Sequence, residues 1–212
     1  MSIHVHRLRL LLILFLFVDA TLAASLYFRE SSAVGVSGNL GSSGVAAIGG
    51  PFALQTIDGA TVTDRTYRGK WMLIYFGYTR CPDACPTALS NIGVAAEKLG
   101  KTADTIAPLF ITVDPERDTR QVMSAYLDSF DRRIVGLTGS RTQIEAVTKA
   151  YRVFVEAHKD QGGDYLVDHS AYFYLMGPDG EFVDVVEGET PGDRLAERLR
   201  VLMAEHSKLG VR

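Results

Sequence analysis

Three stretches of the chain consist almost entirely of apolar residues. Residues 71–76 form the first and are followed by Gly77, residues 106–113 form the second, and residues 134–138 form a shorter third stretch. Apolar runs of this kind, about four to eight residues long, are typical of strands that are buried on both faces of a sheet. We therefore predict three buried strands.

Apolar residues at helical spacing predict amphipathic helices after each of these strands and at the end of the chain. The predicted helices cover residues 86–101, 120–130, 140–151 and a last segment that begins at Pro191. Gly100 ends the first helix, Asp118 or Thr119 can cap the second, and Ser140 can cap the third. The apolar face of the last helix consists of Leu195, Leu199, Leu202 and Met203.

Turn signals flanked by alternating residues predict two β-hairpins. They join residues 52–57 to 61–63, and 171–176 to 182–186. In front of the second hairpin, residues 153–155 are expected to be extended and residues 159–164 to form a polar loop. Tyr172, Phe173 and Tyr174, in the second hairpin, are expected to belong to the core.

The order of these elements predicts the fold class. Strands followed by crossover helices favour a mostly parallel sheet, and the late hairpin adds antiparallel strands. We predict an α/β fold with a central mixed sheet, flanking helices and an N-terminal β-hairpin. Because two cysteines follow the first buried strand, a thioredoxin-like fold is expected. Sites in such sheets lie beyond the carboxyl ends of the strands, where Cys81, Cys85, the loop that begins at Asp114 and the loop around His169 would meet.

The N-terminal segment predicts export of the domain. Arg7 and Arg9 precede an apolar segment over 10–28 that is interrupted by Asp19. As a helix this segment would be roughly 28 Å long, close to the ~30 Å hydrocarbon core of a membrane. Residues 1–30 are therefore interpreted as a membrane anchor, with a cleaved signal peptide as the alternative. Both place the domain outside the cytoplasm, because the arginines remain on the cytoplasmic side.

Composition separates the rest of the chain into a linker and a domain. Residues 31–49 are rich in Gly, Ser and Ala and are interpreted as a flexible linker. Residues 50–212 are predicted to form a single domain of thioredoxin-like fold. The formal charge of −3 offers no basic excess for phosphates, so nucleic acid is not an expected partner.

Cys81 and Cys85 are the two cysteines of the chain and allow three interpretations. A structural disulfide would close a small loop and stabilise the fold by only roughly 2 kcal/mol. A catalytic dithiol is favoured by the helix N-terminus and by Arg80, which lower thiol pKa values. However, three residues separate the cysteines, and no proline precedes the strand after His169. A metal site of two thiolates and one imidazole would suit Cu(I) and can also hold Cu(II).

The histidine that completes such a site is expected to be His169. His4 and His6 precede the apolar segment, and His206 lies near the end of the last helix. His158 begins a polar loop, whereas His169 directly precedes a buried strand.

Three separated motifs resemble the Sco/SenC family of copper chaperones. They are FGYTRCPDACP at 76–86, VDPERDT at 113–119 and DHS at 168–170. The resemblance extends from about residue 50 to the C-terminus. It implies a thioredoxin-like fold, a copper site of Cys81, Cys85 and His169 for one Cu(I) or Cu(II), and a role in assembling the CuA centre of cytochrome c oxidase. That role would proceed by copper delivery, by reduction of the centre's cysteines, or by both.

The same resemblance implies the partners and the compartment. The client would be the copper-site subunit of cytochrome c oxidase, with a copper donor protein and a thiol reductant as further partners. The domain would face the bacterial periplasm or the mitochondrial intermembrane space. We expect a chaperone without catalytic turnover; the alternative is a thiol-disulfide oxidoreductase or thiol peroxidase that uses Cys81 and Cys85.

Two features near these motifs have open roles. The mixed-charge loop is interpreted as a solvated loop with a helix cap, or, from the family resemblance, as a neighbour of the copper site and a surface for the client. Its charged residues are Asp114, Glu116, Arg117 and Asp118. Asp168 could orient His169 through its second ring nitrogen, as carboxylates do at other metal sites, or could be a plain exposed aspartate.

Overall fold

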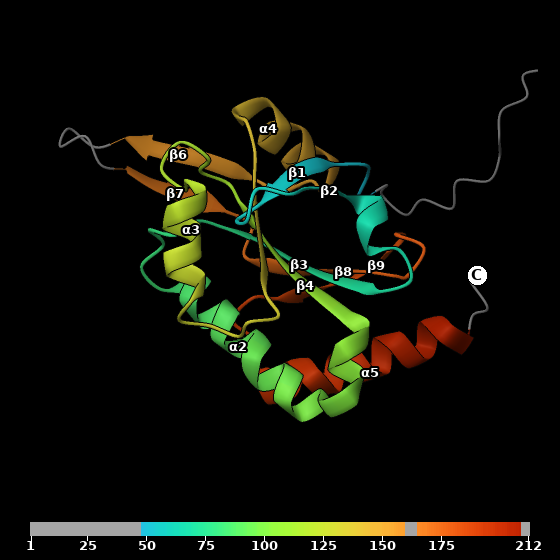
Figure 1. The fold of residues 1–212 in the computed structure, drawn as a ribbon. Helices are drawn as coiled ribbons and strands as arrows, with labels where there is room; N and C mark the ends of the chain where they lie inside the picture. Colours follow the sequence, from blue (N-terminus) through green and yellow to red (C-terminus); the bar gives the residue numbers. More distant parts are fainter. Residues whose placement is uncertain (1–47, 160–164, 209–212) are drawn as a thin grey trace, which may run out of the picture. The chain divides into compact units, whose positions relative to one another are not determined.

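A seven-stranded mixed sheet forms the centre of the domain (Figure 1). The computed structural model describes residues 48–159 and 165–208. The strand order is β2-β1-β5-β4-β3-β8-β9; β3, β4 and β5 are parallel, and β8 is antiparallel to β3. The strands are β1 (Ala53–Thr56), β2 (Thr61–Thr63), β3 (Trp71–Gly77), β4 (Ile106–Thr112), β5 (Val135–Thr138), β8 (Tyr172–Met176) and β9 (Phe182–Glu187). This arrangement confirms the predicted α/β class.

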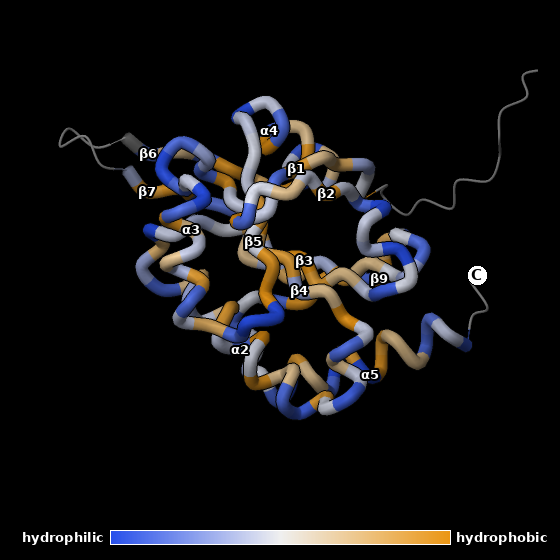
Figure 2. Tube along the Cα trace, viewed as in Figure 1, coloured by the Kyte–Doolittle hydropathy of each residue, from blue (hydrophilic) through white to orange (hydrophobic). Residues whose placement is uncertain are grey.

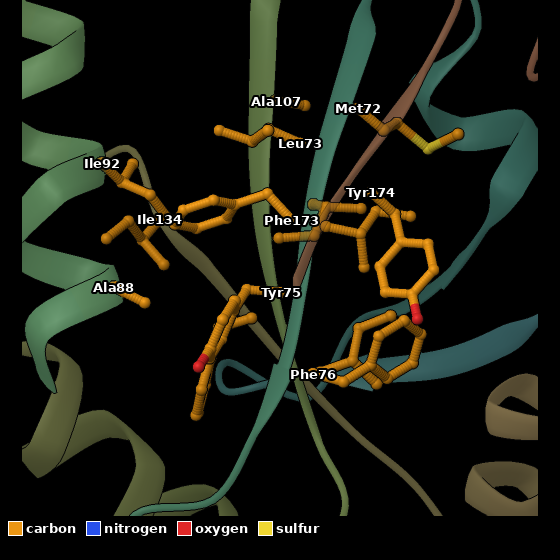
Figure 3. Packing of buried hydrophobic residues seen from close by; sticks show 14 of the residues in the cluster. Met72, Leu73, Tyr75, Phe76, Ala88, Ile92, Ala107, Ile134, Phe173 and Tyr174 are labelled. Carbon is orange, nitrogen blue, oxygen red and sulfur yellow. The ribbon is translucent and has the colours of Figure 1, made fainter. Parts of the chain in front are cut away.

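Helices cover both faces of this sheet. They are α2 (Ala84–Leu99), α3 (Arg120–Leu127), α4 (Arg141–Ala150) and α5 (Gly192–Lys208), with two short 3₁₀ helices, η1 (Asp64–Tyr67) and η2 (Gly100–Thr105). Side chains of β3 alternate between the two faces: Leu73 and Tyr75 point toward α2, and Phe76 points to the opposite side (Figure 3). On that side Phe76 packs against Tyr151, which directly follows α4, with ring centroids 5.5 Å apart.

The buried strands and the capped helices are confirmed. All seven residues of β3 and all seven of β4 are buried, as continuous apolar runs require. The strongly apolar residues of the tube in Figure 2 gather along these central strands. Thr119 and Ser140 accept hydrogen bonds at the starts of α3 and α4, and Gly100, with a φ of 59°, ends α2.

Two local predictions need correction. Helix α2 begins at Ala84 rather than at Pro86. Pro86 fits inside the first turn because the N–H groups of that turn make no intrahelical hydrogen bonds. Cys85 is thereby part of the helix. Phe173 and Tyr174 are core residues as expected, but Tyr172 is 43% exposed because it lies at the start of β8 and faces outward.

A separate two-stranded ribbon was not predicted. Antiparallel strands β6 (Val155–Lys159) and β7 (Tyr165–His169) pair only with each other among the described residues. The ribbon stands apart from the central sheet beside α3 and α4 (Figure 1). Polar residues alternate with Val155 and Ala157 in β6, and only three apolar residues precede Asp168 in β7, so neither strand forms an apolar run of the usual length. The predicted polar loop over 159–164 lies, apart from Lys159, outside the described residues.

The predicted membrane anchor and most of the predicted linker lie outside the residues that the structure describes. The apolar segment 10–28 and all but the end of the linker 31–49 precede residue 48. Within the described ranges, no helix has the length and apolar character needed to cross a membrane. The boundaries of the anchor, linker and domain therefore stay predictions.

Candidate metal centre

Cys81, Cys85 and His169 meet beyond the carboxyl end of β3. Cys81 lies in the turn after that strand, Cys85 in the first turn of α2, and His169 at the end of β7. Their sulfur and ring-nitrogen atoms all lie within 4.8 Å of one another, and both cysteines are free thiols. The described residues contain no second group of three such side chains. The structure therefore brings together the three residues that the sequence singled out.

The two thiols occupy unequal environments. Cys85 is fully buried, Cys81 is half-buried, and the backbone N–H of Cys85 lies 3.4 Å from the sulfur of Cys81 as a donor. Hydrogen bonding from the Cys85 thiol, with smaller contributions from His169 and from backbone N–H groups, lowers the pKa of Cys81. The same interaction and burial raise the pKa of Cys85. Cys81 is therefore the more readily ionised of the pair.

Gly77 makes room for the buried sulfur. A Cβ atom at this position would lie 2.8 Å from Cys85 Sγ and 2.8 Å from a ring carbon of Phe110. Both distances are shorter than carbon makes in packed proteins, so only glycine lets α2 bring its cysteine this close to the end of β3. The glycine that ends the apolar run thus has a packing role at the site.

His169 presents one ring nitrogen to the cysteines. Its Nε2 lies 3.5 Å from Cys85 Sγ, and its Nδ1 lies 3.2 Å from the backbone carbonyl oxygen of Ser170. With the proton on Nδ1 and donated to that carbonyl, Nε2 keeps its lone pair free for a metal. Tyr75 and Tyr78 hold the ring in edge-to-face contacts with centroid distances of 6.1 and 5.9 Å.

Asp168 does not orient His169. Its Oδ2 lies 2.9 Å from Nε2 of His158, and both side chains are exposed on the outer side of the ribbon. Successive residues of a strand point to opposite faces, so Asp168 and His169 cannot share a site on β7. The group that faces Nδ1 of His169 is thus the backbone carbonyl of Ser170. The sequence could not indicate it, because every residue has a backbone carbonyl.

Asp118 is a buried support rather than a solvated loop residue. It is 0% exposed and accepts hydrogen bonds from the Thr79 hydroxyl and the Thr112 hydroxyl, each at 2.6 Å. The backbone N–H of Thr79 donates to it as well, at 3.1 Å. Asp118 thereby ties the cysteine turn to the end of β4. Thr119, and not Asp118, caps α3.

Asp114 and Arg117 connect this loop to the ribbon. Asp114 is 4% exposed, pairs with Arg117 and accepts a hydrogen bond of 2.7 Å from the Tyr165 hydroxyl. The guanidinium of Arg117 lies 3.5 Å from the centroid of the Tyr165 ring and 5.8 Å from that of Tyr78. The solvated-loop interpretation is therefore wrong for these residues as well, and it holds for Glu116, which is exposed and pairs with Arg141.

Two tyrosines near the cysteines escaped the sequence interpretation. In the sequence, Tyr75 is part of an apolar run and Tyr78 is only a position of the first motif, yet both contact His169. Burial, and then negative charge on the cysteines, raises the pKa of Tyr75, so its phenol stays protonated at neutral pH. The alternation of β3 offered a signal, because Tyr75 and Gly77 lie on the same face of that strand.

The remaining described histidines lie elsewhere. His206 packs edge-to-face on Trp71 and pairs with Glu181, near the end of α5, and His158 lies on the outer side of the ribbon. His4 and His6 precede the described residues. His169 is thus the histidine of the described ranges that approaches the thiols.

The donor set determines which metals the site suits. Two sulfurs and one imidazole nitrogen form a soft set of three ligands, which fits Cu(I) and can also hold Cu(II). Structural zinc sites use four protein ligands, and the described residues supply no fourth donor here. A thioredoxin-like α/β domain with such a site defines a class of metal- and thiol-handling proteins.

Comparison with known proteins identifies the family within this class. The family model described as SCO1/SenC matches residues 41–204, and the chain belongs to this family. The human protein SCO1 homolog, mitochondrial, is 45% identical over 144 residues, which cover 66% of this chain and 48% of that protein. A mouse SCO1 homolog is 41% identical over 170 residues, covering 79% of this chain and 60% of that protein. This chain thus spans about half to three-fifths of these curated relatives.

A solved structure agrees in fold. The Bradyrhizobium japonicum ScoI structure with copper bound has a TM-score of 0.69 and 44% sequence identity, covering 74% of this chain and 99% of that one. The thioredoxin-like fold expected from the sequence is confirmed.

Proposed function

We propose that the chain binds one copper ion through Cys81, Cys85 and His169. The observation that carries this proposal is the convergence of their donor atoms within 4.8 Å, although the residues come from a turn, a helix and a ribbon. The softness of two thiolates and the free Nε2 of His169 match the preferences of Cu(I) and Cu(II). The copper-bound state of the related Bradyrhizobium ScoI supports the assignment.

The copper is proposed to be cargo for cytochrome c oxidase assembly. Membership in the SCO1/SenC family supports delivery to the CuA centre in the copper-site subunit of the oxidase. Three protein ligands leave coordination positions open, so a thiolate of the client can bind the same ion before it leaves. Because Cys81 is half-buried, a client thiolate can reach the copper beside it, whereas the fully buried Cys85 stays bound to the ion.

Copper reconstitution of the reduced protein tests this proposal. The reduced, tag-free chain should retain one copper ion after anaerobic loading and desalting. His169→Ala should weaken Cu(I) binding modestly and abolish the stable Cu(II) form, because Cu(II) favours nitrogen ligands and a higher coordination number. Cys81→Ser and Cys85→Ser should each lose most binding of both oxidation states.

His158→Ala is the matched control for the histidine. It removes an imidazole eleven positions earlier in the chain, on the outer side of the ribbon, and should leave both spectra unchanged. If His158→Ala loses the Cu(II) band and His169→Ala keeps it, His158 and not His169 is the copper ligand. Retention of copper by both cysteine variants would reject the site.

A thiol-disulfide reaction is the second candidate function. The pairing of a half-buried thiol of lowered pKa with a buried thiol of raised pKa suits nucleophilic attack followed by resolution. Two thiols would give two electrons and two protons to a disulfide of the client and become a disulfide themselves. Such a form offers no thiolate, so we expect the oxidised protein to bind no copper, which mass spectrometry with added Cu(I) can measure.

The cellular setting is also a proposal. An N-terminal anchor over 10–28 would hold the domain at a membrane, in the periplasm or the mitochondrial intermembrane space. The mitochondrial location named for the human relative is consistent with the second compartment. Alkaline carbonate extraction of native membranes tests the anchor, and release of the full-length chain into the supernatant would contradict it.

A further inference from the structure

The hydroxyl group of Tyr75 is buried beneath the candidate metal centre. The residue is 0% exposed, and its Oη makes no hydrogen bond of ordinary geometry among the described residues. A buried hydroxyl without a hydrogen bond destabilises a folded protein, so such a group requires a physical explanation. The described surroundings of the ring indicate one.

The hydroxyl end of the ring is directed toward Cys85. A Cβ atom at Gly77 would lie 2.8 Å from Cys85 Sγ and 3.2 Å from Tyr75 Cε1, a ring carbon next to the hydroxyl-bearing carbon. The sulfur and this end of the ring therefore converge on the same space. In Figure 3 the ring extends toward the turn of α2 that carries Ala88, one turn after Cys85.

The ring has little freedom to move away. On its other edge, a Cβ atom at Gly188 would lie 2.8 Å from Tyr75 Cε2, and the ring packs against Phe173 with centroids 5.2 Å apart. The edge-to-face contact with His169 fixes it from the side of the site. Tyr75 thus contacts the proposed ligand His169 and lies close to the proposed ligand Cys85.

We propose that Tyr75 is a positioning residue of the metal centre, whose hydroxyl donates a hydrogen bond to Cys85 Sγ when that sulfur is a copper-bound thiolate. The inference rests on the proposed copper site. A neutral thiol is a weak acceptor, whereas a thiolate is a strong one, so the hydroxyl gains a good partner when the metal replaces the thiol proton. The bond withdraws electron density from the sulfur and favours Cu(I) over Cu(II).

Tyr126 provides a matched control. Its hydroxyl, on α3, is also buried without a hydrogen-bond partner among the described residues. Its ring, however, packs on Phe110 and Phe130, with centroid distances of 6.0 and 5.2 Å, away from His169. Tyr75→Phe and Tyr126→Phe therefore remove the same atom from the same core, one from a ring that contacts His169 and one from a ring that packs on two phenylalanines.

The test compares both variants with the wild-type chain after copper loading. All three proteins should bind one copper ion. In Tyr75→Phe the thiolate-to-Cu(II) absorption band should move to longer wavelength, because the sulfur lone pairs rise in energy without the hydrogen bond. The ratio of Cu(I) to Cu(II) affinity should fall about tenfold, the order expected for losing one hydrogen bond to a charged group. Tyr126→Phe should match the wild type.

Several outcomes would overturn the inference. An unchanged band and ratio in Tyr75→Phe would do so, and so would equal shifts in both phenylalanine variants, which would point to packing. A wild-type chain that binds no copper would instead reject the proposed function, and with it this inference. If Tyr75→Phe fails to fold, the wild-type copper–sulfur stretching frequency decides: it should shift between H₂O and D₂O, and an unchanged frequency would contradict the hydrogen bond.

Discussion

The candidate metal centre joins two regions of different construction. The cysteines come from the turn after β3 and the start of α2, where every residue of the strand is buried and the helix packs on the sheet. His169 comes from the β6–β7 ribbon, whose strands pair with each other and not with the central sheet. One side of the site is therefore set by the central sheet and α2, and the other by the ribbon, which buried Val167 and a small number of polar contacts hold in place.

Those contacts are specific. The Tyr165 backbone carbonyl accepts a hydrogen bond of 2.8 Å from Arg117, and the Val167 N–H donates one of 3.3 Å to the Tyr78 hydroxyl. A cleft of about 440 Å³ separates the ribbon from α4, so side-chain packing supports it less on that side. We infer that changes in the core alter stability and both copper states together, whereas changes in the ribbon act mainly through the histidine.

Gly77→Ala should have the largest effect, because it acts on the core side. The added methyl group would collide with Cys85 Sγ and with the buried Phe110 ring. We expect a loss of about 1–3 kcal/mol in the free energy of unfolding and weaker binding of both Cu(I) and Cu(II). Denaturant unfolding and copper titration measure the two effects.

Gly93→Ala is the control for this change. Its added Cβ would lie 3.6 Å from the nearest side-chain atom, in ordinary contact, within α2. It should leave copper binding unchanged and stabilise the helix by up to about 1 kcal/mol. Equal copper loss in both variants would show that the helix, and not the space beside Cys85, controls the site.

Asp118→Asn should have a smaller effect of the same kind. An amide nitrogen cannot accept the hydrogen bonds that one carboxylate oxygen receives, and the Thr79 turn loses part of its support. We expect a loss of about 1–2 kcal/mol in the free energy of unfolding at neutral pH. Exposed Asp128→Asn serves as the control and should change stability little.

The difference in unfolding free energy between the wild type and Asp118→Asn should depend on pH with a defined sign. Burial raises the pKa of Asp118 above 3.8, so the folded protein binds its proton more tightly than the unfolded chain does. The stabilising contribution of the carboxyl group is thus fully present below pH 3.8 and falls as pH rises through the folded pKa. The wild-type advantage over Asp118→Asn should be larger at about pH 4 than at pH 7; a difference that grows with pH would contradict this.

Tyr165→Phe acts on the ribbon side. It removes the hydrogen bond from the tyrosine hydroxyl to Asp114 while the ring stays against Arg117. We expect a stability loss of about 1 kcal/mol and a weakened Cu(II) form with Cu(I) nearly unchanged, since only the histidine loses support. Tyr172→Phe, at an exposed position on β8, is the control for spectra and stability. Equal weakening of both copper states would contradict the division between core and ribbon.

Asp168→Asn should have the smallest effect. It alters only the exposed contact between the Asp168 carboxylate and His158 on the outer side of the ribbon. Such pairs contribute about 0–1 kcal/mol, so thermal unfolding should change by no more than that. The Cu(II) band should be unchanged, because the Ser170 carbonyl and not Asp168 faces the second nitrogen of His169. A displaced band would restore Asp168 as the orienting group.

The sequence by itself determined the parts of the fold that depend on local patterns. Apolar runs located β3 and β4, helical spacing and caps located α2 to α5, and turn residues located both hairpins. These signals are reliable because burial periodicity and capping involve residues close together in the chain. The three motifs likewise singled out Cys81, Cys85 and His169, which the structure brings together.

Only the tertiary structure decided which polar residues lie inside. Asp118 and Asp114 looked like members of a charged loop, yet hydrogen bonds from Thr79, Thr112 and Tyr165 hold them in the interior. These partners lie up to 51 positions away in the chain, so no local pattern could announce them. Strand alternation puts Tyr75 on the same face as Gly77, but only the tertiary structure brings His169 against its ring.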